Sequence, residues 1–360
     1  MPKWLRQERH WSSLASSYDM KKHVNIPIFI PHLGCPNDCV FCNQRTISGV
    51  KEFHWESVIP IIEGALATVD PGTETELAFF GGSFTGIDRD LMINLLSVAN
   101  GYLKQGRITS IRCSTRPDYI NTEILDILKE YGVDTIELGL QSVSDGVLIS
   151  SRRGHTFADE AIACALIKSS GFRLGGQMMI GLPGAGIEDE IATAEFIASV
   201  GADEARIYPT IVFRDTELCH MAAQGVYKPL ALDDAVARSA KAFGILTKAG
   251  VRVLRIGLCD SENLHSSDTY YAGPNHAAMG ELVIGEYYYS LISDSLSRQA
   301  IGSGARLHIY APMGHLSKVI GQNKKNKIRL LQEFGISDVR VSESSDIPVF
   351  SVLIEAEERK

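Results

Sequence analysis

The chain has 360 residues, of which 45% are hydrophobic and 22% charged, a composition typical of a globular enzyme and not of a disordered or fibrous protein. The formal net charge of −8 excludes nucleic-acid binding through overall charge, so such a contact would need a local basic patch. The first 23 residues contain no apolar segment of a signal peptide, and no apolar stretch reaches membrane-spanning length. Seven cysteines, an odd number, favour a reducing compartment, and we expect a cytoplasmic protein.

Apolar, strand-like runs alternate with helical patterns along most of the chain. Strands are expected at residues 24–30, 76–80, 110–114, 135–139, 174–180 and 204–208, and a further strand at 251–258. Helices are expected at residues 55–69, 88–104, 122–131, 158–169, 188–200 and 233–249. This alternation predicts a parallel sheet built from βα units, whose chemistry lies at the carboxyl ends of the strands.

Three cysteines follow the first expected strand in a C-x3-C-x2-C pattern formed by Cys35, Cys39 and Cys42. Thiolates are preferred ligands of iron–sulfur clusters, zinc and Cu(I), and so short a loop cannot hold three cysteines together by packing alone. A structural zinc site and a cubane cluster both take four ligands, but the next cysteine in the sequence is Cys113. The spacing therefore predicts a cluster with one open iron, and a zinc or disulfide knot is the alternative.

With Phe41 directly before Cys42, this loop resembles the cluster-binding loop of the radical S-adenosylmethionine (SAM) superfamily. The resemblance implies an α/β protein with a partial (β/α)6 TIM-like barrel from about residue 25 to residue 249. It also implies a [4Fe-4S] cluster held by the three cysteines, with SAM chelated by the open iron and Phe41 within the cofactor-binding motif.

The second expected strand ends in Gly81-Gly82-Ser83. Paired glycines at a strand end allow the backbone to approach a ligand closely, although a simple turn has the same signature. In radical SAM proteins this is the Gly-Gly-Glu position, whose backbone binds the SAM amino group. Ser83 replaces the glutamate, as a hydroxyl residue does in the catalytic subunit of Elongator, so a carboxylate is lost while the backbone geometry is kept.

Polar residues also follow the third and fourth expected strands, namely Ser114, Arg116, Glu137 and Gln141. Such side chains supply the hydrogen bonds that a carboxylate, a ribose and an adenine require, and buried polar groups are costly without partners. Both stretches resemble those of the Elongator catalytic subunit and of oxygen-independent coproporphyrinogen oxidase, where they contact the methionine carboxylate and ribose. The alternative is that Glu137 and Gln141 pair with Arg116 in a structural network.

Three further strand-end regions add candidate contacts. The turn at residues 151–156 resembles an Arg-Gly-His-Thr element of the same relatives, so Arg153 is expected to clamp an anion of SAM or substrate, or else to be solvated. Gln177, in the fifth strand, is expected to contact adenosine by the same resemblance. Arg206 and Tyr208 of the sixth strand point to the barrel mouth if side chains alternate, where they would face the cofactor and the substrate.

Beyond residue 258 the pattern changes. Residues 271–283 are expected to form a Gly/Pro-marked loop, in which His276 is a proton donor or a surface histidine. A strand, a helix and a strand follow at residues 306–310, 315–334 and 338–341. Residues 319–328 resemble the Val-Ile-Gly-x-x-Gly-x-x-Ile element of KH-type RNA-binding folds, but Lys324 replaces the second glycine. A basic cluster there is either an RNA contact or a solvated helix face; its members are Lys318, Lys324, Lys325, Lys327 and Arg329.

We therefore predict an N-terminal extension (1–24), a barrel with a C-terminal extension (25–300) and a small α+β, KH-like domain (301–360). The expected activity is reductive cleavage of SAM at a [4Fe-4S] cluster to a 5′-deoxyadenosyl radical that modifies tRNA or rRNA. Expected partners are RNA and a one-electron reductant such as flavodoxin or ferredoxin, with no membrane. No acetyltransferase domain is recognised, so acetyl-CoA chemistry is not expected. The alternative is a heme-chaperone-like or porphyrin-type radical SAM protein without an RNA substrate.

Overall fold

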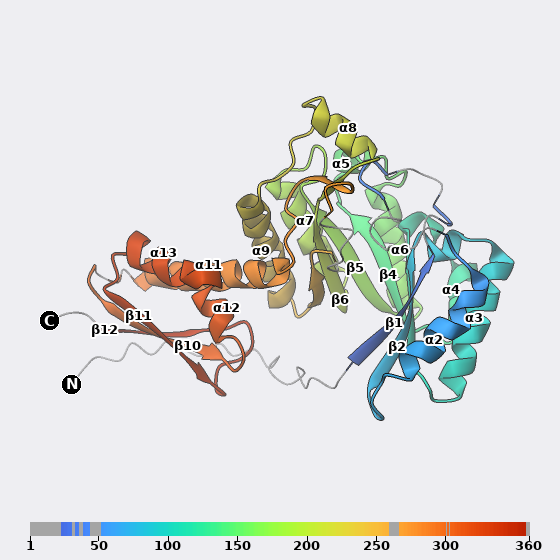
Figure 1. Ribbon diagram of the computed structural model, residues 1–360, viewed down its shortest axis with the longest axis horizontal. Helices are drawn as coiled ribbons and strands as arrows, with labels where there is room; N and C mark the ends of the chain where they lie inside the picture. The colour runs from blue at the N-terminus through green and yellow to red at the C-terminus, as the bar shows by residue number, and fades with distance from the viewer. Residues whose placement is uncertain are drawn as a thin grey trace.

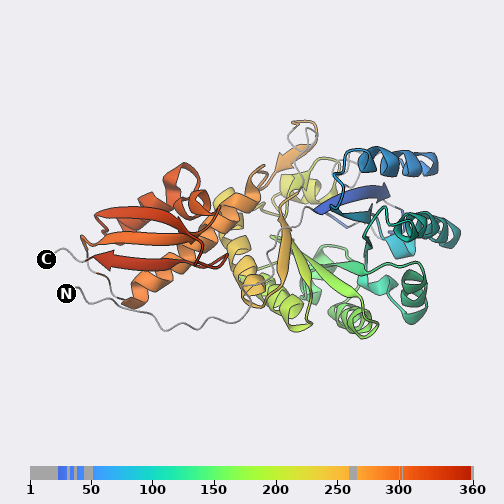
Figure 2. The same cartoon turned by 90° about the horizontal axis from the view of Figure 1, so that it is seen from below.

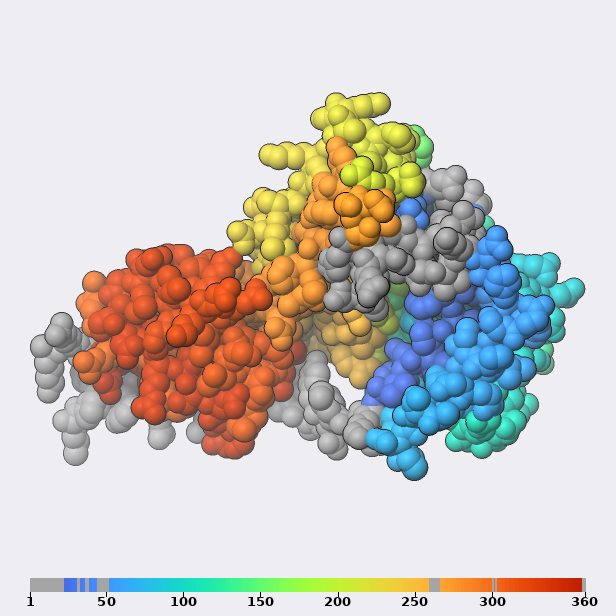
Figure 3. Space-filling model, in the orientation of Figure 1, coloured from blue at the N-terminus to red at the C-terminus, as the bar shows by residue number. Residues whose placement is uncertain are grey.

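A computed structural model describes residues 23–30, 33–35, 39–43, 52–258, 266–299, 301 and 303–357. These residues form a larger lobe around a seven-stranded sheet and a smaller C-terminal lobe around a three-stranded sheet, and Figure 3 shows the smaller lobe beside the larger one. Among the described residues, no helix has the length and apolar character needed to cross a membrane.

The seven-stranded sheet is parallel throughout, and its strands lie side by side in chain order. Its strands are β1 (His23–Ile30), β2 (Glu74–Gly81), β3 (Ser110–Thr115), β4 (Thr135–Gln141), β5 (Arg173–Ile180), β6 (Glu204–Pro209) and β8 (Arg252–Ile256). The sheet curves into an open half-barrel, as Figures 1 and 2 show. The predicted α/β class and partial barrel are confirmed, and the strand expected after residue 250 completes the sheet as its seventh member.

Helices cover the outer face of this sheet (Figure 2). They are α2 (Val58–Leu66), α3 (Arg89–Lys104), α4 (Thr122–Glu130), α6 (Phe157–Ser169), α7 (Ile187–Ser199) and α9 (Leu232–Lys248). Local chemistry defines their starts: the Asn121 side chain caps α4 by accepting the amide of Ile124, and Thr156 and Asp159 form a capping box on α6. Apolar residues of one stripe on each helix then pack on the sheet.

Shorter elements lie at the carboxyl end of the barrel and in its connections. They are α5 (Asp145–Ser150), α8 (Glu217–Ala223), β7 (Val212–Phe213), β9 (Tyr270–Ala272) and the 3-10 turns η1 (Trp55–Ser57), η2 (Phe84–Gly86) and η3 (Pro117–Tyr119). The strands β7 and β9 pair antiparallel. None of these elements was predicted as such, because segments this short carry too few residues to show a period; residues of η1 were expected to begin the helix at 55–69.

The C-terminal lobe has the strand order β11-β10-β12, with β10 parallel to β11 and antiparallel to β12. Its elements are β10 (Arg306–Pro312), α12 (Leu316–Ile320), η4 (Gln322–Lys324), α13 (Lys325–Glu333), β11 (Asp338–Ser344) and β12 (Leu353–Glu357). The single helix predicted at 315–334 is two helices, because Gly321, Asn323 and Lys324 have positive φ values of 79°, 53° and 62° that no α-helix accommodates. The strand β12 was not predicted.

One long helix, α11 (Met279–Gln299), joins the two lobes. The predicted loop therefore ends at residue 278, where His276 accepts the amide of Ala278 at 3.0 Å and lies just before the helix. Met279 and Val283 belong to the barrel core, whereas Ile292 and Leu296 belong to the core of the C-terminal lobe. The two cores thus meet along this helix, and Phe350 of the C-terminal lobe also packs against both.

Candidate active site

The cysteine loop follows β1 and is docked onto two neighbouring segments. The amide of Val40 donates to the carbonyl of Ser151, and the amide of Leu218 donates to the carbonyl of Val40. Cys39 is buried, while Cys35 and Cys42 are half-buried. Phe41, also half-buried, packs against the small apolar cluster around Val40 and Leu218. These contacts hold the described part of the loop at the carboxyl end of the barrel.

The three thiols form no disulfide among the described residues. No three Cys, His, Asp or Glu side chains in the described chain are gathered closely enough to ligate a single metal ion. In a four-iron cluster each cysteine binds a different iron, so its three ligands are spread more widely than those of one ion. Three cysteines on one partly exposed loop are a donor set that fits such a cluster.

The Gly81-Gly82 turn brings the end of β2 against this loop. The amide of Gly82 donates to Ile30 and that of Ser83 to Leu33, at 2.8 and 3.1 Å. A Cβ atom on Gly82 would lie only 1.9 Å from the carbonyl oxygen of Leu33, and one on Gly81, whose φ is +117°, would meet Ile30. These glycines are therefore required for the close approach of the loop itself, in addition to any approach of a ligand.

Ser83 does not take the place of a carboxylate that faces a ligand. Its side chain is fully buried, and its hydroxyl oxygen lies 2.9 Å from that of Thr115 and accepts the backbone amide of Arg116 at 3.1 Å. With serine in place of glutamate, this position therefore connects the ends of β2 and β3 through hydrogen bonds.

Several buried polar atoms at the ends of β3 and β4 have no hydrogen-bond partner within the described chain. They are Oγ of Ser114, Nη1 of Arg116 and Oε1 of Gln141. Gln141 has a φ of 73° at a bulge in β4, a strained backbone that turns its side chain out of the strand alternation. Buried polar groups without partners are rare in proteins, and a bound water or ligand ordinarily completes their hydrogen bonds. The predicted cofactor contacts of β3 and β4 thus fit a polar ligand such as SAM.

Two arginines adjoin the cysteine loop. Arg116 forms a bidentate pair with Asp118 at 2.9 and 3.0 Å, and its Nη2 also donates to the carbonyl of Arg153. Nη1 of Arg153 donates to Sγ of Cys39 at 3.3 Å, and its Nη2 donates to the carbonyl of Gly139 at 2.6 Å. The predicted residues Arg116 and Arg153 are therefore brought together with the cysteines, although 114 residues separate Cys39 from Arg153.

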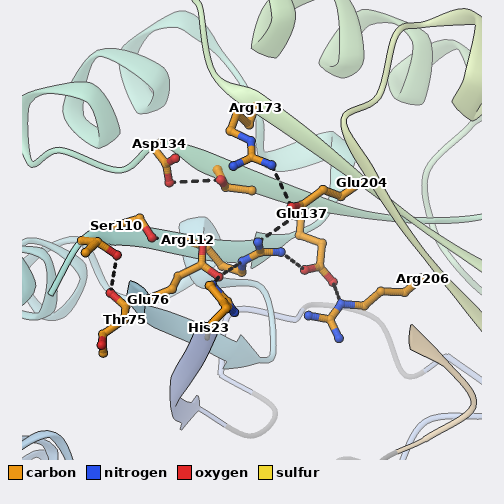
Figure 4. A network of polar contacts seen from close by, with 12 residues as sticks. His23, Thr75, Glu76, Ser110, Arg112, Asp134, Glu137, Arg173, Glu204 and Arg206 are labelled. Atoms are coloured by element: carbon orange, nitrogen blue, oxygen red, sulfur yellow. Dashed lines mark hydrogen bonds and ion pairs between the residues drawn. The ribbon is translucent and has the colours of Figure 1, made fainter. Parts of the chain in front are cut away.

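The other predicted residues lie within the barrel: Glu137 and Arg206 belong to the charged network of Figure 4, and Gln177 and Tyr208 contact them. Glu137 is 1% exposed; one oxygen accepts from Arg112 at 3.0 Å and the other forms an ion pair with Arg206 at 2.7 Å and accepts from Gln177. Tyr208 hydrogen-bonds Arg206, whose guanidinium lies over the ring of Phe80. Glu137 therefore has arginine partners, but they are Arg112 and Arg206 and not Arg116.

The centre of this network is Arg112, which sequence reasoning did not single out. Its guanidinium contacts Glu76 at 2.7 Å, Glu137 at 3.0 Å and Glu204 at 2.8 Å, and all four side chains are nearly inaccessible. Burial alone would raise the pKa of Glu204, but Arg112 and Arg252 outweigh burial and lower it. The alternation of each strand places these charged residues on the inner face, a signal present in the sequence: parallel strands buried on both faces are ordinarily apolar throughout.

A second buried pair lies behind the Arg153 turn. Nε2 of His155 and Oε1 of Glu160 are 2.9 Å apart, and neither side chain is exposed. Burial raises the pKa of Glu160 to about 9, and burial together with Arg153 and Arg116 lowers the pKa of His155 to about 4. Both directions favour an uncharged pair, a protonated Glu160 beside a neutral His155.

Comparison with known proteins agrees with this geometry. The chain matches the model of the radical SAM superfamily over residues 29–197 and that of the Radical_SAM C-terminal domain over residues 202–289. It is 30% identical over 206 residues to the tRNA uridine(34) acetyltransferase of Methanocaldococcus jannaschii, covering 52% of this chain and 38% of that protein. It is 30% identical over 203 residues to Elongator complex protein 3 of Homo sapiens, covering 51% of this chain and 37% of that protein.

Among solved structures, the archaeal Methanocaldococcus infernus Elp3 with an N-terminal deletion superposes with a TM-score of 0.59 at 22% identity. That likeness covers 78% of this chain and 64% of that chain, and it shows a shared fold. The chain spans less than two fifths of the length of the two curated relatives named above. The two family matches and the cysteine loop at the end of β1 agree: the chain belongs to the radical SAM superfamily, whose enzymes use a [4Fe-4S] cluster and SAM.

Proposed function

We propose that this radical SAM enzyme modifies RNA, and that residues 301–360 form the domain that binds it. The observation that carries the proposal is the order of elements in the C-terminal lobe. The helices α12 and α13 lie between the parallel, adjacent strands β10 and β11 and are joined by residues 321–324, a Gly-x-x-Lys loop. A Gly-x-x-Gly loop between two helices is the element with which KH domains clamp the nucleotide backbone.

The backbone of this loop has the geometry that its glycine pattern requires. Lys324 replaces the second glycine, yet its φ of 62° is the left-handed conformation that glycine favours. A Cβ atom on Gly321 would lie 2.9 Å from the side chain of Asn326, and Asn326 in turn donates to the carbonyl of Gly285 in α11 at 2.8 Å. The loop is therefore anchored, and Lys324 retains a glycine-type conformation.

The basic cluster around this loop has fewer available cations than its composition indicates. Three of its five members already have partners: Lys325 pairs with Asp233 at 2.8 Å, Lys327 donates to the carbonyl of Val339 at 2.7 Å, and Arg329 pairs with Glu286 at 2.6 Å. Lys318 and Lys324 make no side-chain hydrogen bond or ion pair with described residues. We assign these two lysines to phosphate contacts.

The named relatives favour tRNA as the first RNA to test. One is a tRNA uridine(34) acetyltransferase and the other Elongator complex protein 3, each matched over a minor part of its length. Enzymes of this superfamily need a reductant, and we propose a one-electron donor such as flavodoxin or ferredoxin acting in the cytoplasm.

At the carboxyl end of the barrel we assign the cluster to Cys35, Cys39 and Cys42. The residues that we propose to bind SAM are Gly81, Gly82, Ser114, Arg116, Gln141 and Arg153, with Phe41 packed beside the cluster and the buried Ser83 holding the ends of β2 and β3 together. When bound, SAM supplies a 5′-deoxyadenosyl radical on one-electron reduction at the cluster. The remaining candidates, Glu137, Gln177, Arg206 and Tyr208, form the inner wall of the barrel, where Arg206 and Tyr208 orient the substrate and the carboxylate of Glu137 fixes Arg206.

The cluster assignment is tested by iron content after anaerobic reconstitution. Alanine at Cys35, Cys39 or Cys42 should abolish binding of one four-iron cluster. Alanine at Cys113 or Cys164 is the matched control, because burial raises the pKa of both thiols to about 12 and both lie in the apolar core. Loss of iron in a control variant with wild-type stability would contradict the assignment.

The RNA proposal is tested by tRNA affinity at two salt concentrations. Changing Lys318 and Lys324 together to glutamine should weaken binding and flatten the dependence of log affinity on log salt by about 1.4–1.8, the value expected for two lost phosphate contacts. Uncoupled formation of 5′-deoxyadenosine should be unchanged, because neither lysine lies in the barrel.

The matched control changes Lys104 and Lys129 to glutamine, which removes the same charge from α3 and α4 at the opposite end of the molecule (Figure 1). This variant should bind tRNA as the wild type does. If the wild-type protein binds neither tRNA nor rRNA fragments at low salt, the RNA proposal is wrong, and stoichiometric heme binding would then favour a heme-chaperone-like protein.

A further inference from the structure

A buried arginine reaches the cysteine loop from the turn at residues 151–156. Nη1 of Arg153 donates to Sγ of Cys39 at 3.3 Å, and the two residues are 7% and 9% exposed. Nη2 of the same guanidinium donates to the carbonyl of Gly139 at 2.6 Å. Arg153 therefore bridges the end of β4 and one of the thiols assigned to the cluster.

The surrounding backbone fixes this bridge. The carbonyl of Arg153 accepts from Nη2 of Arg116 at 2.5 Å, and its amide donates to Leu148 at 2.9 Å. The amide of Val40, next to Cys39, donates to Ser151 in the same turn. Because turn and loop are joined through main-chain atoms, the distance between guanidinium and thiol is set by the fold and not only by a side-chain rotamer.

The neighbouring Arg152 points elsewhere. Its side chain is 60% exposed and pairs with Glu217 at 3.0 Å, and its φ of 52° turns the chain between the two arginines. The two residues have the same charge and adjacent positions, but only Arg153 contacts a cysteine within the described chain. Arg152 is therefore a matched control for effects of charge alone.

We propose that Arg153 is a positioning residue that raises the reduction potential of the cluster by donating a hydrogen bond to the Cys39 thiolate. One-electron reduction adds negative charge to a cluster whose ligands are already anionic. A hydrogen bond and a buried positive charge at a ligating sulfur stabilise the reduced state more than the oxidised state, which raises the potential. The electron comes from the external one-electron donor. This role does not depend on the identity of the substrate.

The test is a potentiometric titration of the reconstituted full-length protein without SAM, followed by electron paramagnetic resonance of the reduced cluster. Arg153→Gln should lower the midpoint potential, because it removes the charge and the guanidinium fork together. Arg153→Lys should lower it less, since it keeps the charge but loses the planar fork that spans Cys39 and Gly139. Arg152→Gln should leave it unchanged.

An Arg153→Gln protein that holds one cluster at the wild-type potential would overturn the proposal. If that variant does not retain a cluster, Arg153→Lys decides, and a wild-type potential there would overturn it equally. An equal decrease in Arg152→Gln would also overturn it, because the effect would then come from general charge and not from the hydrogen bond.

Discussion

Replacing Arg112 by methionine would leave three buried carboxylates, those of Glu76, Glu137 and Glu204, without the guanidinium that now contacts all of them (Figure 4). Glu137 would keep its ion pair with Arg206, and Glu204 would keep its ion pair with Arg173. Glu76 would have no arginine partner within the described chain, where its remaining ion-pair partner is His23 at 3.6 Å. Glu76 is 3% exposed, so water cannot replace the lost partner. The largest part of the cost should therefore arise at Glu76.

Removing one partner of a buried ion pair costs about 3–5 kcal/mol, because the remaining charge stays buried and uncompensated. For a chain of 360 residues, with an unfolding entropy of about 2.1 cal/mol/K per residue, each kcal/mol lowers the melting midpoint by about 1.3 °C, so we expect Arg112→Met to lower the midpoint by about 4–7 °C. Methionine fills similar space with a flexible apolar chain, so the loss reports charge and hydrogen bonds more than a cavity.

Scanning calorimetry at one fixed scan rate measures this shift. The double variant Arg112→Met with Glu76→Gln should recover part of the loss, because a buried amide needs no counter-charge. Arg173→Gln is the control: Arg173 also pairs with Glu204 but is 48% exposed, so its removal should cost less than about 1 kcal/mol. If Arg112→Met melts within about 2 °C of the wild type, or if Glu76→Gln recovers nothing, the network does not stabilise the barrel in the way argued.

Gly82→Ala should reduce cluster content, because its Cβ would lie 1.9 Å from the carbonyl oxygen of Leu33 and displace the cysteine loop; wild-type iron content after reconstitution would contradict this. In the wild type, the raised pKa of Glu160 contributes stability that is fully present below the ordinary pKa of a glutamate and is lost as the pH rises to the folded-state pKa of about 9. Glu160→Gln removes this titration, so its melting midpoint should fall less than that of the wild type between neutral pH and about pH 9. The lowered pKa of His155 affects stability only on the acid side, where stability is lost as the pH falls from the ordinary pKa of a histidine to about 4, so it does not mask this effect. If the melting midpoints of the variant and the wild type fall equally between neutral pH and about pH 9, the raised pKa assigned to Glu160 is wrong. Lys324→Gly should raise the free energy of unfolding, measured by urea denaturation, by up to about 1 kcal/mol, because glycine adopts a φ of 62° without strain. A destabilised variant would show that contacts of the lysine side chain stabilise the fold by more than the left-handed backbone of Lys324 destabilises it.

The sheet and its covering helices were predicted from the sequence because their periods are regular. The helix α11 was not predicted, because its buried residues belong to two cores. Met279 and Val283 pack in the barrel core, whereas Ile292 and Leu296 pack in the core of the C-terminal lobe. A helix that changes its buried face along its length shows no single apolar stripe. The break at Lys324 was missed for a different reason, since lysine rarely adopts a left-handed backbone.

The candidate site was predictable where its residues lie close together in the chain. The spacing of Cys35, Cys39 and Cys42 predicted a cluster loop, and the residues after each strand gave the candidate cofactor contacts, both of which stay predictions. The contact between Arg153 and Cys39 spans 114 positions, and the choice between Arg152 and Arg153 depends on a backbone turn that composition does not reveal. Arg112 was overlooked because its glutamate partners lie on three other strands, at 36, 25 and 92 positions from it in the chain.

The shared helix α11 has a consequence for how the enzyme can meet a long substrate. Its 21 residues make a rod about 30 Å long, and its two halves are embedded in different cores. The loop at residues 321–324 is thus held at a fixed distance from the barrel. A domain on a flexible linker would instead sample a range of distances. A polymer bound by this loop would place in the barrel only the segment that lies at that separation from the bound segment. The position that is modified would therefore depend on its distance along the polymer from the bound segment, as well as on the chemistry of the reacting atom.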